Sequence, residues 1–161
     1  MRIEPERLAL RPLAERDYDA WAGLLGDGEA TRLLHTPDAV TDPERLRAAL
    51  GRWIDLHREP IGMYAVAVAD DTVGFVGFVP RELPWGDELE LGWLFQRRAW
   101  GHGYATEAAR ALRPLAPGRV ISLIRVENAA SAGVARKLGM EIERTVDYYG
   151  FSTDVWVSPA P

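Results

Sequence analysis

The run Val120-Ile-Ser-Leu-Ile-Arg-Val126 most constrains the fold, because it is apolar at nearly every position and is too apolar to have one polar face. A strand of this kind is typical of a sheet that is covered on both faces. A strand over 88–95 and a helix over 105–115 precede it, and a short helix over 128–138 follows it. The strand, helix and strand from 88 to 126 therefore predict a right-handed parallel crossover.

The other segments show one of two periodicities. Strand-like patterns cover 7–11, 63–69, 73–79, about 141–147 and about 151–157, and helix-like patterns cover 15–25 and 42–57. Residues 26–41 show no clear period and predict a loop. This order predicts an α/β (α+β) fold with a mixed central sheet of about six to seven strands and helices on both faces. With 161 residues, no internal repeat and no linker, the chain predicts a single domain over 1–161.

Composition and charge argue against several classes of function. The formal charge of −5 disfavours a nucleic-acid partner, which normally needs a basic patch, and is compatible with a cationic substrate. No apolar run approaches the ~20 residues of a membrane span, and the N-terminus shows no secretory signal. The chain has no cysteine, and His35 and His57 lack metal-ligand spacing, so no metal is expected. We expect a cytoplasmic protein with no nucleic-acid or membrane partner; its oligomeric state, monomer or homodimer, stays open.

The stretch Arg98-Ala-Trp-Gly-His-Gly-Tyr-Ala105 lies between the strand at 88–95 and the helix that follows. A helix N-terminus leaves about four N–H groups unpaired and carries a partial positive charge, and glycine lets a phosphate approach the backbone. The stretch therefore indicates a pyrophosphate site; a turn whose glycines serve only backbone geometry is the alternative. A P-loop is excluded, because Gly103 is followed by Tyr104-Ala105, and a dinucleotide fingerprint is excluded by a missing third glycine.

The run Glu90-Leu-Gly-Trp-Leu-Phe-Gln-Arg-Arg-Ala-Trp-Gly-His-Gly-Tyr-Ala-Thr-Glu-Ala108 resembles motif A of the GNAT N-acetyltransferases. Arg98, Gly101 and Gly103 match its core pattern Gln/Arg-x-x-Gly-x-Gly/Ala. The later run from Arg125 to Met140 resembles motif B, and its Asn-x-x-Ser form followed by Lys-Leu-Gly-Met is similar to the RimJ/RimL branch. The resemblance extends over nearly the whole chain.

This resemblance implies a GNAT fold whose sheet is splayed between the strands at 88–95 and 120–126, with acetyl-coenzyme A (acetyl-CoA) as co-substrate in the gap. Strand backbone would pair with the pantetheine arm, and the amides of residues 98–105 would wrap the pyrophosphate. Asn128 would hydrogen-bond the pantetheine near its sulfur end, and Ser131 would lie beside the thiol. The cofactor-binding residues that the resemblance implies are Trp93, Leu94, Phe95, Arg98, Gly101, His102, Gly103, Tyr104, Ala105, Asn128 and Ser131.

An amine attacks a thioester only as the free base, and at neutral pH an α-amine with a pKa of about 8 is roughly ten percent deprotonated. Glu90 is the candidate general base, because it lies next to the splay and faces away from the apolar stripe of its strand. GNAT enzymes often use a glutamate on this strand, and partial desolvation raises the pKa of such a carboxyl. The alternatives are an ordered water or Glu88 as the base, and a Glu90 that is only solvated or ion-paired. Glu88, on the same face, and Trp85 are assigned to the substrate pocket.

Many GNAT proteins use a tyrosine on the helix after the second splayed strand to protonate the leaving thiolate, but Ala135 occupies that position here. The RimJ/RimL pattern points instead to Ser131 as a hydrogen-bond donor to sulfur, with Tyr148 and Tyr149 as weaker alternatives. The resemblance therefore implies an acetyl-CoA-dependent N-acetyltransferase that acts by direct attack in a ternary complex. Its acceptor would be a protein or peptide α-amine, or a small-molecule amine. A non-catalytic, acyl-CoA-binding module with the GNAT fold is the alternative.

Overall fold

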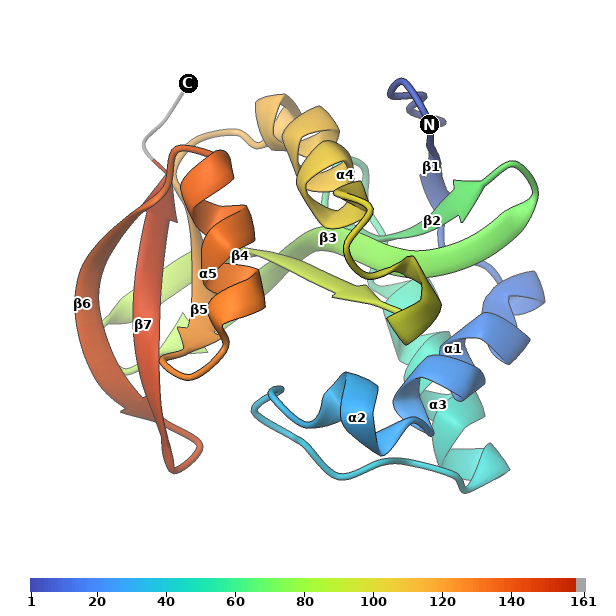
Figure 1. Ribbon diagram of the computed structural model, residues 1–161, viewed down its shortest axis with the longest axis horizontal. Helices are drawn as coiled ribbons and strands as arrows, with labels where there is room; N and C mark the ends of the chain where they lie inside the picture. Colours follow the sequence, from blue (N-terminus) through green and yellow to red (C-terminus); the bar gives the residue numbers. More distant parts are fainter. Residues whose placement is uncertain (159–161) are drawn as a thin grey trace.

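One seven-stranded sheet organises the chain, in the order β1-β2-β3-β4-β5-β7-β6 (Figure 1). The computed structural model describes residues 1–158, and residues 159–161 of the expected domain lie outside the described residues. The strands are β1 Ala9–Pro12, β2 Gly62–Val68, β3 Asp71–Leu83, β4 Gly86–Phe95, β5 Val120–Arg125, β6 Glu141–Tyr148 and β7 Phe151–Ser158. The helices are α1 Tyr18–Leu25, α2 Gly28–Thr31, α3 Pro43–Asp55, α4 Tyr104–Leu112 and α5 Ala129–Lys137, with short 3-10 turns η1 Glu15–Asp17, η2 Arg97–Ala99 and η3 Arg113–Leu115.

The sheet divides between β4 and β5, which run parallel and meet at a single register pair, Glu90 with Ile121. On its other edge β4 pairs with β3 along its whole length, from Gly86 to Phe95. Beyond Glu90 the two parallel strands diverge, as Figure 1 shows, so that one edge of β4 has no neighbouring strand there. The mixed sheet and the splay between these strands confirm the predicted fold.

Residue alternation decides which helices cover each face of the sheet. Val66 of β2, Phe78 of β3 and Leu91 of β4 lie on one face and pack with α4. Side chains on the opposite face, such as Phe75 of β3, pack with α1 and α3. Trp93 of β4 packs against the α4 cluster and also against the cluster that contains Ala135 of α5, so α4 and α5 lie on the same face. The sheet is covered on both faces, as its apolar strands predicted.

Two segments differ from the sequence prediction. The expected loop at 26–41 contains the short helix α2, whose N-cap Asp27 accepts a hydrogen bond from the Glu29 amide at 3.1 Å. Four helical residues are too few to show a period. The strand expected over 73–79 continues to residue 83, because β4 returns beside it and pairs as far as Leu83 with Gly86. This extension places Arg81 on the sheet beside Glu90.

A buried carboxylate fastens the start of α1 to the sheet. Asp17, which is 1% exposed, accepts hydrogen bonds from both terminal nitrogens of Arg11 on β1 at 2.7 Å each. It also accepts bonds from the Ala14 amide and from the Thr72 hydroxyl on β3. Burial alone would raise the pKa of Asp17, but these hydrogen bonds and the Arg11 charge hold it below its usual value. The network positions the helix that carries Trp21.

Within residues 1–158, no helix has the length and apolar character that a membrane span requires.

Candidate active site

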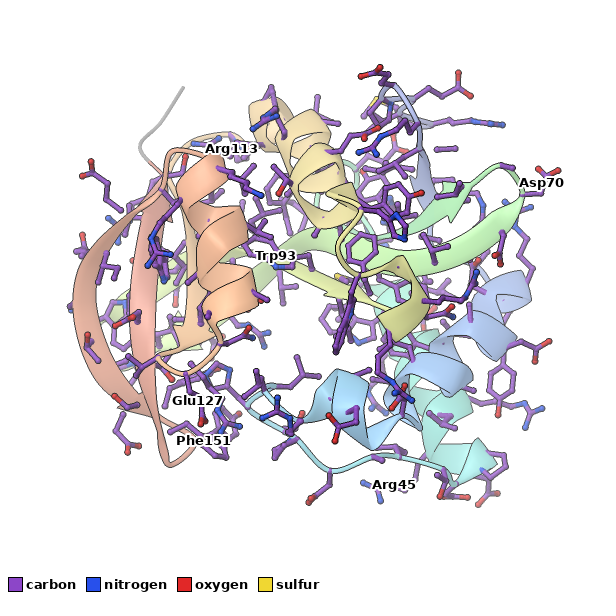
Figure 2. The ribbon with its side chains drawn as sticks, viewed as in Figure 1. Arg45, Asp70, Trp93, Arg113, Glu127 and Phe151 are labelled. Carbon is purple, nitrogen blue, oxygen red and sulfur yellow. The ribbon has the colours of Figure 1, made fainter. Side chains whose placement is uncertain are left out.

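Two clefts adjoin at the splay, one on each face of the sheet. The α4 cleft has a volume of about 470 Å³ and lies beside α4 and α5, and the α1 cleft has a volume of about 420 Å³ and lies beside α1 and α3. Trp93, labelled in Figure 2, stands near the point where they meet. The residues that line both clefts are Leu33, Leu34, Trp93, Leu94, Asn128 and Ser131. Molecules bound in the two clefts would therefore come into contact.

The α4 cleft contains the glycine-rich turn and the N-terminus of α4. Gly101 and Gly103 both have φ of +78°, a left-handed conformation that glycine adopts without steric cost, and Gly103 is the N-cap of α4. The next residues, from Tyr104 to Thr106, line the cleft at the first turn of the helix, where backbone N–H groups lack intrahelical partners. This arrangement has the donors and the partial positive charge that an anionic ligand requires.

Arg7 holds this turn in place from the other end of the chain. Its backbone nitrogen and Nε donate to the Glu107 carboxylate at 2.7 Å each, and its Nη1 donates to the His102 carbonyl at 3.0 Å. Its guanidinium also lies 5.1 Å from the centre of the Tyr104 ring. Sequence reasoning missed Arg7, since no local pattern indicates a contact between residues 100 positions apart.

The predicted cofactor residues lie along the α4 cleft, except for Arg98 and His102. The Arg98 side chain points elsewhere, because it donates to Asp71 at the β2–β3 turn and to the Gln96 side chain. The His102 ring stacks on Tyr104, with 5.2 Å between ring centres. Neither side chain lines the cleft, whereas the backbone of both residues is part of the turn.

Several side chains of the α4 cleft were not among the predicted cofactor residues. Trp100 is half exposed, and its indole nitrogen donates to the Phe95 carbonyl at 2.9 Å. Arg32 and Lys137 bring positive charge to the lining, and Glu29 of the same lining lies 3.7 Å from Nε of Arg32. Only Trp100 could have been predicted from the sequence, because it lies next to the glycines of the turn. Arg32 and Lys137 lie far from that turn in the sequence.

Asn128 and Ser131 lie where the two clefts adjoin, at the start of α5. Asn128 is the N-cap of this helix, and its Oδ1 accepts a hydrogen bond from the Ser131 amide at 3.1 Å. The Asn128 side chain uses its oxygen in this bond. The NH2 group of the same side chain has two N–H groups that can donate to a ligand. Ser131 has the only side-chain hydroxyl in the lining shared by the clefts within residues 1–158. Tyr148 and Tyr149 line the α1 cleft alone.

The α1 cleft contains one ion pair, between Glu90 and Arg81. Nε of Arg81 donates to Oε2 of Glu90 at 2.6 Å, and their side chains are 37% and 12% exposed, in that order. Burial alone would lower the pKa of Arg81, but the charge and hydrogen bond of Glu90 raise it. The contact uses one carboxylate oxygen, and the other has lone pairs of its own. Sequence reasoning did not find Arg81, because it lies beyond the strand predicted over 73–79.

The segment after α2 closes over the α1 cleft. Nη1 of Arg125 donates to the carbonyls of Arg32 and Leu34 at 3.1 Å each. The Arg125 guanidinium also pairs with Glu127 and lies 3.7 Å from the centre of the Phe151 ring. Figure 2 shows Glu127 and Phe151 beside this segment. Arg125 therefore ties the segment to β5 and β7.

His35 makes a second attachment between this segment and β7. Its Nε2 lies 2.9 Å from the Thr153 hydroxyl, and its ring meets Tyr148 edge to face. Burial, followed by the charges of Arg125 and Arg81, lowers the pKa of His35 to about 4, so the imidazole is neutral at neutral pH.

Trp85 and Glu88, which the sequence assigned to the substrate pocket, do not line the α1 cleft. Glu88 pairs with Arg119 at 2.7 Å, and Trp85 packs in the cluster of Ile121 and Val155. Both precede the single register pair at Glu90, so they lie on the closed side of the splay. Alternation along β4 placed Glu88 on the same face as Glu90. Only the pairing of β4 with β5 showed where the sheet opens.

In the described part of the chain, no group of three or more His, Asp or Glu side chains could hold a metal ion.

Two clefts that meet from opposite faces of one sheet are an arrangement that suits a group transfer between two bound molecules. The family model described as "Acetyltransferase (GNAT) domain" matches residues 7–141, so the chain belongs to the GNAT acetyltransferase family and is an acyltransferase. Uncharacterized protein YkkB of Bacillus subtilis is 30% identical over 159 residues, covering 90% of this chain and 88% of that relative. An uncharacterized N-acetyltransferase, p20 of Bacillus licheniformis, is 28% identical and covers 91% of this chain and 92% of its own.

Solved structures share the fold. RimL, a ribosomal L7/L12 alpha-N-protein acetyltransferase in complex with coenzyme A, superposes with a TM-score of 0.84 at 21% identity, covering 99% of this chain and 98% of its own. The microcin C7 self-immunity acetyltransferase MccE, in complex with acetyl-CoA and AMP, gives a TM-score of 0.79 at 14% identity, covering 96% of this chain and 93% of its own. At these identities the likeness shows the GNAT fold.

Proposed function

We propose that this protein is an acetyl-CoA-dependent N-acetyltransferase in which the α4 cleft holds the cofactor and the α1 cleft holds an amine. The observation that carries the proposal is the shared lining of the two clefts at the splay. It allows the thioester and the amine to meet directly, and the chain has no cysteine that could form an acyl-enzyme. The coenzyme A and acetyl-CoA complexes of the two solved relatives support the choice of donor.

The cofactor binds along the unpaired edge of β4, with its pantetheine arm beside Trp93, Leu94 and Phe95. Its pyrophosphate takes hydrogen bonds from the backbone of the turn at 98–105 and from the first turn of α4. Arg32 and Lys137 add charge attraction for the phosphates, since both line this cleft. Asn128 keeps its side-chain nitrogen to donate to the pantetheine near the sulfur.

In the transfer step the nitrogen of the amine attacks the thioester carbonyl carbon, and the carbon–sulfur bond then breaks. Glu90 accepts the amine proton, directly or through one water. A backbone N–H near Leu94 or Phe95 stabilises the oxyanion. The thiol of coenzyme A has a pKa near the ~8.5 of cysteine, so its thiolate is a fair leaving group. The Ser131 hydroxyl donates a hydrogen bond to that sulfur, which suits its position between the clefts.

The similarity to the RimJ/RimL branch supports an acceptor that is a protein or peptide α-amine, or a small-molecule amine. Residues 1–161 form one domain in this proposal. The acidic, cysteine-free composition supports a cytoplasmic location without a nucleic-acid or membrane partner. The protein is active as a monomer or as a homodimer, and sedimentation of the purified chain separates the two.

A thiol-release assay with acetyl-CoA and a panel of amines tests this function. Glu90→Gln is expected to lower kcat at least about a hundredfold and to change the acetyl-CoA Kd less than about twofold, because it removes the proton acceptor alone. Glu88→Gln is the matched control: it alters a glutamate on the same face of the same strand, outside the cleft. An unchanged rate in Glu90→Gln eliminates Glu90 as the base. Acetyl-CoA binding without turnover on any amine would favour a non-catalytic module.

A further inference from the structure

Each charged side chain in the lining of the α1 cleft already has a partner of opposite charge. Glu90 pairs with Arg81 at 2.6 Å, and Arg125 pairs with Glu127. Within residues 1–158, the lining has no other acidic or basic side chain except His35, which is neutral at neutral pH. Moving a charged group out of water is costly when no opposite charge receives it. A second ammonium group, or a carboxylate, on the acceptor would therefore weaken its binding in this cleft.

The reacting amine is the one ionisable group of the acceptor that the cleft can serve. Glu90 uses Oε2 in its bond to Arg81, and its other carboxylate oxygen keeps lone pairs that can accept a proton from the amine. The amine attacks as the free base and is uncharged at that point. The chain's charge of −5 was compatible with a cationic substrate, but this lining contains two arginines and one carboxylate. Polyamines and aminoglycosides, which carry several ammonium groups, are therefore disfavoured.

The rest of the lining is mostly apolar and aromatic. Leu25, Trp53 and Leu94 line the cleft and are only partly buried, so they keep surface that a ligand can cover. They pack against a buried cluster that includes Trp21 and Phe75, whose rings meet edge to face at 5.2 Å. A volume of about 420 Å³, beneath a segment that is hydrogen-bonded in place, suits a compact molecule. Apolar surface of the acceptor is therefore stabilised where a further charge is not.

We propose that the acceptor is a compact monoamine with an apolar body and no other charged group. Its apolar body lies against Leu25 and Trp53, and its amine lies at the splay, between Glu90 and the thioester. In the reaction the amine nitrogen bonds to the acetyl carbonyl carbon, its proton passes to Glu90, and the carbon–sulfur bond breaks. The products are an uncharged N-substituted acetamide and free coenzyme A. This inference rests on the proposed N-acetyltransferase function.

Two sets of matched acceptors test the chemical class. Hexylamine is compared with hexamethylenediamine and aminohexanoate, which add an ammonium group or a carboxylate to a similar chain. Phenethylamine is compared with L-phenylalanine, which adds a carboxylate, and with ethylamine, which lacks the ring. At least one of the two monoamines is expected to have a kcat/KM at least about tenfold above every relative in its set, a difference of about 1.4 kcal/mol. Smaller differences in both sets, or a higher kcat/KM for spermidine, kanamycin or a serine-initiated peptide, overturn the inference but leave the proposed function intact.

Tryptophan variants test where the apolar body binds. Trp53→Ala removes the indole from the wall, so the KM for phenethylamine should rise about tenfold, while the KM for ethylamine and the acetyl-CoA Kd stay within about twofold. Trp53→Leu keeps an apolar side chain and should change the KM for phenethylamine less. Trp85→Ala is the matched control, because Trp85 is also partly buried but lies outside both clefts. Equal effects of Trp53→Ala and Trp85→Ala, or equal effects on the two amines, contradict the assignment of Trp53.

Calorimetric binding to the coenzyme A complex separates failure of this inference from failure of the proposed function. If no amine is acetylated although acetyl-CoA binds, the function has failed, and the class of ligand is still tested. Hexylamine or phenethylamine should then bind at least about tenfold more tightly than each relative in its set. Equal affinities within both sets, or no binding of either monoamine, overturn the inference.

Discussion

The ion pair between Asp17 and Arg11 leads to a stability prediction that can be worked out from its contacts. Asp17 is 1% exposed and receives four hydrogen bonds, two of them from Arg11 at 2.7 Å. Asp17→Asn removes the negative charge and turns one acceptor into an NH2 group that faces donors. Losing one partner of a buried pair typically costs about 3–5 kcal/mol, and Arg11 retains some access to water, so we expect a loss of about 2–4 kcal/mol.

The same pair predicts a dependence on pH. Burial alone would raise the pKa of Asp17, but the hydrogen bonds from Arg11, Ala14 and Thr72 lower it below 3.8 in the folded protein. The unfolded state therefore binds more protons between the two pKa values, and stability rises with pH in that window. The contribution of Asp17 is complete above about pH 4 and is lost as the pH falls through the folded pKa. The free-energy gap between wild type and Asp17→Asn should shrink below about pH 4.

Urea denaturation followed by circular dichroism, repeated across this pH range, measures the gap. Asp71→Asn is the control, because it breaks the pair of Asp71 with Arg98, whose side chains are 61% and 53% exposed. Solvent screens such a pair, and its loss should cost no more than about 1 kcal/mol. Equal losses in the two variants, or a gap for Asp17→Asn that stays constant below pH 4, would refute this reasoning.

Two further predictions concern the α4 cleft. Ser131→Ala should lower kcat about tenfold with little change in the acetyl-CoA Kd, because the hydroxyl stabilises the departing sulfur more than the bound thioester. Ser131→Thr keeps the hydroxyl and should retain most of the rate. An unchanged kcat in Ser131→Ala would show that Ser131 does not have this role. Lys137→Ala should raise the acetyl-CoA Kd about three- to fivefold at low salt and less at high salt, measured by calorimetry, because ions screen its attraction to phosphate. A Kd that does not change at low salt means that Lys137 does not contact the phosphates.

Much of the fold was predictable because strands and helices place their signals within a few neighbouring residues. The alternation of Leu91 and Trp93 against Glu90 assigned the faces of β4 correctly, and the apolar run of β5 correctly predicted a covered sheet. The glycines at 101 and 103 marked the turn before α4 because only left-handed backbone fits there. The errors occurred where local signals were short or ambiguous, as in the four-residue helix α2 and in the extension of β3 past Val79.

Sequence alone determined the order of the elements other than α2, the family, and the glycine-bearing turn that borders the α4 cleft, because each depends on residues close together in the chain. Tertiary structure decided where the sheet opens, and with it that Glu90 lines the α1 cleft while Glu88 does not. It also decided that Arg7 holds the turn and that Arg125 closes the α1 cleft, through contacts that join residues 91 or more positions apart. No local pattern encodes such contacts, since they exist only after the sheet has brought distant segments together.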